Sequence, residues 1–187
     1  METSSDRLPP GPLTYEDYCE LPEDGNRYEI LDGELFVSPA PVPLHQTVSA
    51  NLEWILMRHV REHRLGHVLH APLDLLLERT TVAQPDVLFI RAGRESIVTD
   101  RAIEGAPDLV VEILSPSTSR KDRTTKASLY ARFGIDHYWI LDPDERAFEL
   151  YERQGAAYRL AARGQGDEAV RPSLFPGLEI PLREIWA

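Results

Sequence analysis

Residues 107–118 read Pro-Asp-Leu-Val-Val-Glu-Ile-Leu-Ser-Pro-Ser-Thr, so that an acid, Glu112, stands inside a run of aliphatic residues. A short apolar run of this kind, bounded by turn residues, predicts a buried strand. A carboxylate in such a strand costs several kcal/mol unless a partner or a metal compensates it. We therefore interpret Glu112 as a functional acid; the alternative is a buried ion pair, for example with Arg120.

A second acid, Asp86, stands in a similar setting upstream. Residues 84–86 read Gln-Pro-Asp and lead directly into the apolar run 87–90. Mg²⁺ prefers oxygen ligands and keeps several waters, so one or two carboxylates and a backbone carbonyl suffice to hold it. Asp86, Glu112 and the carbonyl of Ile113 are the candidate ligands, with a turn acid as the alternative reading of Asp86.

An amine follows these acids on a predicted helix. Residues 120–133 have a helical pattern that ends at Gly134, and Ser119 is the expected cap, with Asp122 three residues on. Lys126 lies on this helix and could orient an attacking water or stabilise the transition state of phosphodiester hydrolysis. The alternative is a lysine that pairs with Asp122, the acid four residues before it.

The remaining pattern predicts a mixed α/β (α+β) fold, in which a mixed sheet is flanked by two principal helices. Extra β-hairpins are expected near both ends of the chain, around Asp32-Gly33 and Gln154-Gly155. Residues 1–12 are expected to be a disordered tail, and residues 13–187 a single domain. Short helical segments are expected after Thr14 and at 181–186, a long helix at 45–63, and strands at 27–31, 34–37, 67–70, 73–78, 86–90, 109–114, 137–142, 147–152 and 157–162.

Composition narrows the class of protein. The single cysteine, Cys19, forms no internal disulfide and fits a reducing compartment, and no leader or membrane span is apparent, so a cytoplasmic protein is expected. A net charge of −11 argues mildly against a nucleic-acid binder. However, residues 115–134 carry five basic residues against one acid, and this local charge is compatible with a phosphate-bearing substrate.

Five segments taken together resemble the Uma family of bacterial restriction endonuclease-like proteins, within the PD-(D/E)xK nuclease superfamily. The resemblance covers residues 13–186, nearly the whole chain. It implies a restriction endonuclease-like fold, an Mg²⁺- or Mn²⁺-dependent endonuclease activity on DNA, and no organic cofactor. Cutting both strands would favour a symmetric homodimer. The segments are Tyr28–Leu35, Ser38-Pro39 with His45, Gln84–Val87, Pro107–Thr118 and Tyr138–Asp142.

The chain departs from the superfamily pattern at Leu114, where the residue two after the acid is normally lysine. In Uma-type proteins the lysine is found on the following helix, which here corresponds to Lys126. Asp122, Lys126 and Tyr130 are spaced by four residues and therefore share one side of that helix. This makes Asp122 and Tyr130 accessory candidates, with a helix cap and a core tyrosine as their respective alternatives.

Three further side chains are accessory candidates. Glu34 resembles the acid that many superfamily members contribute upstream of the aspartate, although a solvated hairpin glutamate is the alternative. Glu29 lies in the same hairpin, and His45 stands at the start of the long helix, where a polar cap is common. A zinc site at His59, His63, His67 and His70 is disfavoured, because Gly66 separates the two pairs and no cysteine accompanies them.

Three functions follow from this reading. The main hypothesis is Mg²⁺-dependent hydrolysis of phosphodiester bonds in DNA, with Asp86 and Glu112 holding the metal and Lys126 steadying the nucleophile. The first alternative is a catalytically inactive nuclease fold used as a binding or structural module, and the second is hydrolysis of a smaller phosphoester. The sequence leaves open the choice between DNA and RNA, the number of metals and the oligomeric state.

Overall fold

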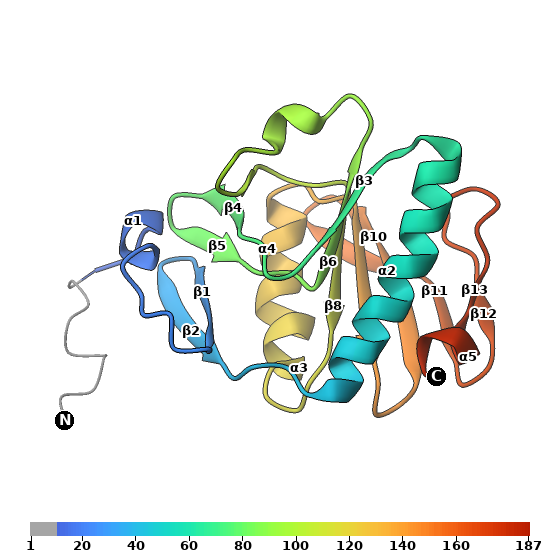
Figure 1. The fold of residues 1–187 in the computed structure, drawn as a ribbon. Helices are drawn as coiled ribbons and strands as arrows, with labels where there is room; N and C mark the ends of the chain where they lie inside the picture. The colour runs from blue at the N-terminus through green and yellow to red at the C-terminus, as the bar shows by residue number, and fades with distance from the viewer. Residues whose placement is uncertain (1–10) are drawn as a thin grey trace.

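The computed structural model describes residues 11–187, so all but the last two residues of the expected tail 1–12 lie outside it. Its centre is a six-stranded sheet in the order β11-β10-β9-β8-β6-β3 (Figure 1). Only β8 and β9 are parallel, and every other neighbouring pair is antiparallel. The strands are β3 (Gly66–His70), β6 (Val87–Arg91), β8 (Leu109–Ile113), β9 (His137–Asp142), β10 (Ala147–Gln154) and β11 (Ala157–Gln165).

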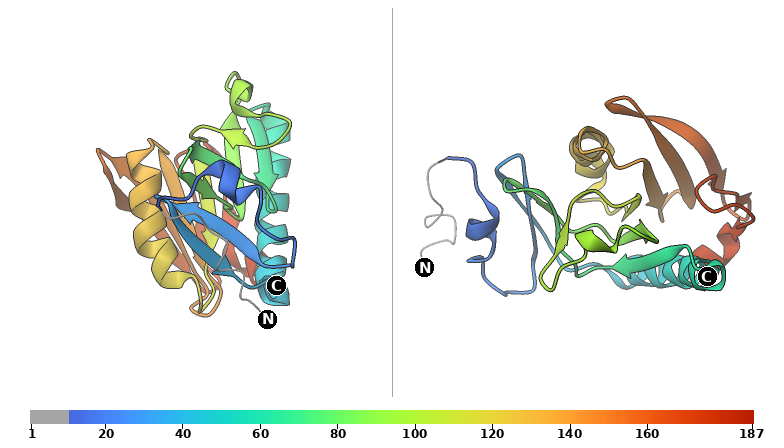
Figure 2. Two further views of the ribbon diagram at one scale, coloured as in Figure 1. Left: turned by 90° about the vertical axis from the view of Figure 1, so that its left-hand side faces the viewer. Right: turned by 90° about the horizontal axis from the view of Figure 1, so that it is seen from above.

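Helices cover both faces of this sheet. The view from above shows α2 (Pro43–His63) on one side and α4 (Ala127–Arg132) on the other (Figure 2). Alternation along β8 divides its side chains between these faces, since Val111 and Ile113 belong to the core beneath α2 and Val110 to the core beneath α4. Glu112 therefore emerges on the α4 side.

A second sheet packs beside the first, in the order β2-β1-β5-β4-β7. Its hairpin turns at Asp32 and Gly33, whose φ values of 52° and 83° suit a tight two-residue turn. At Gly33 an added Cβ would meet the Cβ of Pro12 at 2.5 Å, so the close approach of that segment also requires glycine. The strands are β1 (Arg27–Leu31), β2 (Glu34–Ser38), β4 (Leu75–Glu78), β5 (Thr81–Ala83) and β7 (Ile103–Glu104).

Small elements complete the fold. The short helix α1 (Tyr15–Tyr18) begins after Thr14 as expected, with a capping box formed by Thr14 and Asp17. The chain ends in α5 (Leu182–Ile185), which contributes to the core beneath α2. No helix within residues 11–187 is both long and apolar enough to cross a membrane. The others are η2 (Glu95–Ile97), β12 (Ala169–Val170) and β13 (Ile180–Pro181).

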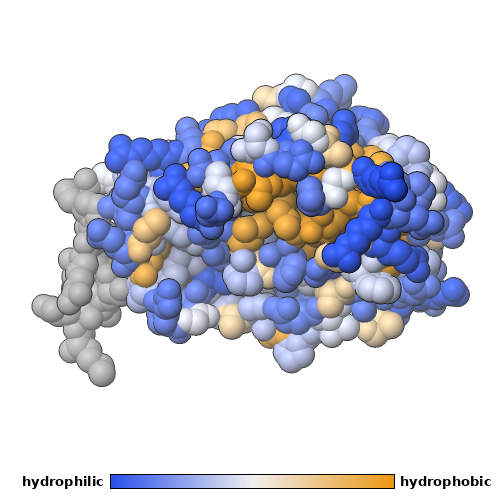
Figure 3. Space-filling model, turned by 45° about the horizontal axis from the view of Figure 1, so that its top comes forward, coloured by the Kyte–Doolittle hydropathy of each residue, from blue (hydrophilic) through white to orange (hydrophobic). Residues whose placement is uncertain are grey.

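The mixed α/β class is confirmed, and so are both hairpins, although β10 and β11 extend the main sheet instead of standing apart from it. The strands β5, β7, β12 and β13 were not predicted, because runs of two or three residues carry almost no periodicity. The surface carries both apolar and hydrophilic areas. Figure 3 shows an apolar area at the centre of one face, surrounded by hydrophilic side chains.

The helix predicted at 120–133 is present, but its start differs from the prediction. It comprises α3 (Ser119–Lys121), a π-helical turn η3 (Asp122–Lys126) and α4. Thr118, not Ser119, precedes the first turn, and within residues 11–187 no side chain caps it. The cap assignment of Asp122 is also wrong, because this carboxylate is buried beside Lys126. A π-turn often marks a functional site, and this one carries both residues.

Candidate functional site

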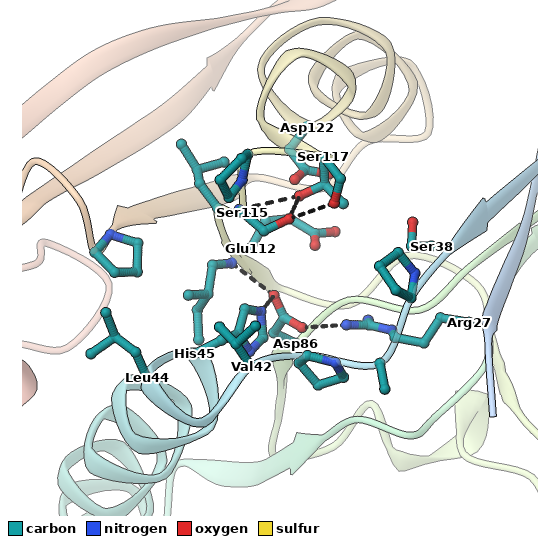
Figure 4. A pocket seen from close by; sticks show the side chains of 18 of the residues that line it. Arg27, Ser38, Val42, Leu44, His45, Asp86, Glu112, Ser115, Ser117 and Asp122 are labelled. Carbon is teal, nitrogen blue, oxygen red and sulfur yellow. Dashed lines mark hydrogen bonds and ion pairs between the residues drawn. The ribbon is translucent and has the colours of Figure 1, made fainter.

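A cavity of about 250 Å³ lies at the carboxyl ends of the parallel strands β8 and β9. In open α/β sheets ligands bind preferentially beyond the carboxyl ends of the strands. The walls come from β1, the connection 38–42, the first turn of α2, the start of β6, the loop 115–118 and η3 (Figure 4). Segments far apart in the sequence thus converge on one space.

Asp86 stands at the edge of this cavity and is almost fully compensated. Its Oδ1 accepts a hydrogen bond from Arg27 Nη1 at 2.9 Å, and its Oδ2 accepts one from the Ile113 backbone N–H at 2.7 Å. His45 Nε2 lies 3.3 Å from the same Oδ2. Burial raises the pKa of the Asp86 carboxyl, but the contacts with His45, Arg27 and Ile113 outweigh it and lower the pKa overall.

Glu112 reaches the cavity from the α4 side of β8. Its Oε1 accepts hydrogen bonds from Lys126 Nζ at 2.9 Å and from the Tyr130 hydroxyl at 2.7 Å. Its Oε2 has no hydrogen-bond partner among residues 11–187, although the side chain is only about 3% exposed. One oxygen is therefore held in place while the other keeps its lone pairs for a ligand.

Lys126 is the centre of the charge network. Its ammonium lies 2.7 Å from Glu29 Oε1, 2.9 Å from Glu112 Oε1 and 3.4 Å from Asp122 Oδ1. Burial lowers the pKa of this lysine, but the three carboxylates outweigh burial and raise it well above its usual value. Lys126 is thus a fixed, permanently charged donor that three acids share.

Glu29 takes a larger part of the positive charge than the other acids. Both lysines of the chain contact it, since Lys121 Nζ lies 2.6 Å from Oε2. Burial raises the pKa of Glu29, but the two lysines lower it to about 2. In addition, Glu29 Oε1 accepts a hydrogen bond from the backbone N–H of Gln84 at 3.0 Å, close to Asp86 in sequence. Glu29 therefore ties β1 to both lysines and to the segment that carries Asp86.

Glu112 is the acid left with too little compensation. Burial raises the pKa of its carboxyl, and the shared Lys126 ammonium opposes this only in part. Repulsion from neighbouring carboxylates, Asp122 foremost, adds to burial, and the pKa stands at about 8. Without an additional cation, Glu112 thus retains a proton near neutral pH.

The structure brings most of the predicted site residues together. Asp86, Glu112, Ile113, Lys126, His45, Glu29 and Asp122 all line the cavity. Tyr130 lies behind Glu112 and donates to it without reaching the cavity. Glu34 is the exception: it is solvent-exposed at the turn end of the hairpin, opposite Leu31, while the other end of the hairpin faces the cavity.

Sequence reasoning missed two basic residues of the site, Arg27 and Lys121. Arg27 is two residues before Glu29 on β1, so strand alternation puts both side chains on one face. Besides Asp86, its guanidinium contacts the carbonyl of Gln84. The signal available was this spacing of basic and acidic residues in the hairpin, but it becomes meaningful only once Glu29 is known to face inward.

The donor set of the cavity suits a hard cation. Asp86 and Glu112 supply carboxylate oxygens, and an extended residue presents its N–H and C=O on the same side, so the Ile113 carbonyl lies on the edge of β8 that faces Asp86. Within residues 11–187, no three His, Cys, Asp or Glu side chains form a metal-binding group. Two carboxylates and a carbonyl, completed by waters, fit Mg²⁺ or Mn²⁺ better than a closed zinc site.

The histidines of α2 form a different arrangement. The rings of His59 and His63 pack at a tilt of 30° with centroids 4.2 Å apart, and His63 Nδ1 lies 3.0 Å from the carbonyl of His59. His67 and His70 are exposed on β3, where their contacts are with Glu95 and Glu53 respectively. His63, His67 and His70 thus each contact a partner other than a shared metal, whereas the buried His59 Nε2 has no hydrogen-bond partner among residues 11–187.

A solved structure has the same architecture. It is titled "Crystal structure of a putative nuclease belonging to DUF820 from Anabaena variabilis ATCC 29413", and it superimposes with a TM-score of 0.76. The alignment covers 94% of this chain and 98% of that chain at 22% sequence identity. At this level of identity the likeness establishes the fold. No curated protein matches the sequence.

The family comparison is more specific. A family model named Uma2, described as "Putative restriction endonuclease", matches residues 15–183. The matched region contains all five segments on which the resemblance to Uma rests, as well as every residue of the cavity. The chain belongs to the Uma2 family of restriction endonuclease-like proteins.

Proposed function

We propose that this protein hydrolyses phosphodiester bonds in DNA with the help of Mg²⁺ or Mn²⁺. The observation that carries the proposal is the single cavity in which Asp86, Glu112 and the Ile113 backbone meet the ammonium of Lys126. Hard-cation ligands beside a fixed amine are the parts that phosphodiester hydrolysis needs. Membership of a family described as restriction endonucleases supports the same chemistry.

The chain's own residues divide the work between ligation and positioning. Glu112 Oε2, Asp86 and the Ile113 carbonyl would hold the cation, which when bound lowers the pKa of water and offsets charge on the phosphate oxygens. Lys126 would donate a hydrogen bond to the attacking water or to the phosphate oxygen that gains charge. Tyr130 donates a hydrogen bond to Glu112, and Glu29 pairs with the Lys126 ammonium. The two residues thereby hold Glu112 and Lys126 in position.

A non-catalytic role for the fold is the competing hypothesis. Leu114 occupies the usual lysine position and the net charge is −11, which both favour it. Against it stands the retention of four buried acids around two lysines and one arginine, an expensive arrangement for a domain without chemistry. Lys126 also restores the missing amine from a different element.

The proposal is tested by incubating the purified protein with supercoiled plasmid, linear duplex DNA, single-stranded DNA and mononucleotides. We expect DNA cleavage with Mg²⁺ or Mn²⁺, and none with a chelator or with Glu112→Gln. Hydrolysis of the small phosphoesters alone would assign the cavity to a smaller substrate. No hydrolysis of any substrate with either metal would leave the non-catalytic role.

The two glutamates of the hairpin provide a matched pair in the same assay. We expect Glu29→Gln to reduce the cleavage rate at least tenfold, because an amide cannot hold both ammonium groups of Lys121 and Lys126. Glu34→Gln removes one charge from the same hairpin at an exposed position outside the cavity and should leave the rate unchanged. Equal effects of the two substitutions would show that Glu29 does not position the lysine.

A further inference from the structure

The outward side of α2 carries a stripe whose residues recur at intervals of three and four. We call Thr47, Ala50, Trp54, Arg58 and Arg61 the α2 stripe; all five are exposed, while Val48, Leu52, Ile55, Leu56 and His59 face the core on the opposite side. Trp54 is 68% exposed, which is unusual for the residue type that normally buries the largest apolar area. A core-packing role does not account for this side chain.

The charge of the α2 stripe is equally unusual for this protein. Arg58 and Arg61 form no ion pair with any of residues 11–187, whereas both lysines and most arginines in this range have an acidic partner. Two acids flank the stripe and neither forms an ion pair with it: Glu53 lies 3.6 Å from His70, and the exposed Glu62 contacts neither Arg58 nor Arg61 as an ion-pair partner. In an otherwise acidic protein, two uncompensated guanidinium groups beside an exposed indole point to an anionic, aromatic partner.

The cavity lies beside the N-terminal end of the helix whose outward side carries the stripe. Val42 and Leu44 line the cavity mouth and are 60% and 47% exposed, and they lie at the N-terminal end of α2. At a rise of 1.5 Å per residue, Trp54 stands about 15 Å along the helix axis from Leu44. Arg58 and Arg61 continue in the same direction along the helix that Figure 1 shows in front of the main sheet. A strand that leaves the cavity past Leu44 and crosses to the outward side of α2 would meet the indole first and the two arginines next.

The low exposure of the two acids in the cavity favours a flexible substrate. Asp86 and Glu112 are only 3% and 2% exposed, and the mouth above them is lined by apolar residues such as Pro39 and Val42. A flexible single strand reaches such recessed carboxylates at a lower deformation cost than a stiff duplex. An unpaired base also offers the free π-face that an exposed tryptophan stacks on.

We infer that the α2 stripe binds single-stranded nucleic acid and delivers it to the cavity. This inference deepens the proposed function and rests on it, since it names the form of the substrate. Trp54 stacks on a base, while Arg58 and Arg61 contact phosphates on either side of it. The apolar mouth formed by Val42 and Leu44 then admits the flexible backbone to Asp86 and Glu112.

Binding is measured with a fluorescent single-stranded oligonucleotide and its duplex, in chelator so that no cleavage occurs. We expect the single strand to bind more tightly than the duplex, and Trp54→Ala to weaken its binding about tenfold. The double variant Arg58→Ala/Arg61→Ala should reduce the slope of log K against log salt by about 1.4, or 0.7 per phosphate contact. The single strand should also quench the intrinsic fluorescence of Trp54. This tryptophan is exposed, whereas Trp139 is buried and the Trp186 indole donates a hydrogen bond to the Gly166 carbonyl.

The matched control is Arg159→Ala/Arg163→Ala, which removes two exposed arginines from β11 and changes the net charge equally. It should leave affinity and salt slope close to those of the wild type. Equal losses in the control, unchanged affinity in Trp54→Ala, or no binding by the wild type would overturn the inference. So would a dimer that Trp54→Ala dissociates without altering oligonucleotide affinity, because the stripe would then bind a second copy of the chain.

Failure of this inference differs from failure of the proposed function. If the protein cleaves DNA but substitutions in the α2 stripe do not change its affinity for the oligonucleotide, the inference fails and the proposed phosphodiesterase activity stands. If substitutions in the α2 stripe weaken the binding of a single strand but no hydrolysis occurs with Mg²⁺ or Mn²⁺, the binding surface stands and the proposed phosphodiesterase activity fails.

Discussion

Lys126→Met should abolish phosphodiester cleavage while leaving the binding of Mn²⁺ intact or tighter. Among residues 11–187 the Lys126 ammonium is the only amine in contact with Glu112, and Leu114 cannot replace it. Removing it deletes a charge that repels the cation but stabilises the transition state, so affinity and rate should move apart. Single-turnover cleavage and calorimetric titration of Mn²⁺ on the same preparation measure the two effects.

Stability needs a control in this experiment, because Lys126 compensates three buried carboxylates. Its loss raises the pKa of those acids and lowers the melting temperature, which is recorded alongside. Lys126→Arg retains the charge, but a planar guanidinium does not replace a compact ammonium beside a water, so we expect partial activity at most. Cleavage by Lys126→Met at the wild-type rate would remove this lysine from the mechanism.

The two acids of the site should have opposite effects on stability when the metal is absent. Asp86→Asn breaks an ion pair with Arg27 and leaves that guanidinium without its partner, which should cost about 3 kcal/mol. At pH 9 the Glu112 carboxyl is ionised, which is unfavourable in the folded protein. Glu112→Gln removes this charge and should raise the free energy of unfolding by about 1–3 kcal/mol at that pH. Thermal or denaturant unfolding in chelator tests both.

The pH dependence of these effects follows from the direction of each shift. The pKa of Glu112 rises from about 4.3 in an unfolded chain to about 8, so its contribution to stability is present below pH 4.3 and lost as the pH rises through 8. The advantage of Glu112→Gln should therefore vanish near pH 5. The pKa of Asp86 is lowered, so its contribution persists at every pH above its unfolded value. Destabilisation by Glu112→Gln at pH 9 would contradict this assignment.

The sequence predicted that Asp86, Glu112 and Lys126 lie together, from local signals and, for Lys126, also from the resemblance to Uma, and the three side chains line one cavity. Burying an acid inside a short aliphatic strand costs free energy, and this indicated a functional role for Glu112. Helical spacing then placed Asp122, Lys126 and Tyr130 on one side of the following element. The parallel pairing of β8 and β9, with the helix between them, puts that side against Glu112.

Other parts of the site depend on contacts between distant segments. Glu29 and Glu34 are both acids of one hairpin, and only the packing of β1 on β5 shows which of them faces inward. Arg27 meets Asp86 and Lys121 meets Glu29 across large sequence separations that no periodicity reveals. Asp108 illustrates the opposite ambiguity: it also follows a proline before a strand, yet it pairs with Arg94 away from the cavity.

Titration of the apo protein with Mn²⁺ by calorimetry is the most direct test that Asp86 and Glu112 form a cation site. The wild type and Glu34→Gln should show saturable binding, because Glu34 lies outside the cavity. Binding should be accompanied by proton release near neutral pH, since Glu112 must ionise to become a ligand. Glu112→Gln and Asp86→Asn should show neither. Unaltered Mn²⁺ binding by both variants would contradict the assignment of the site.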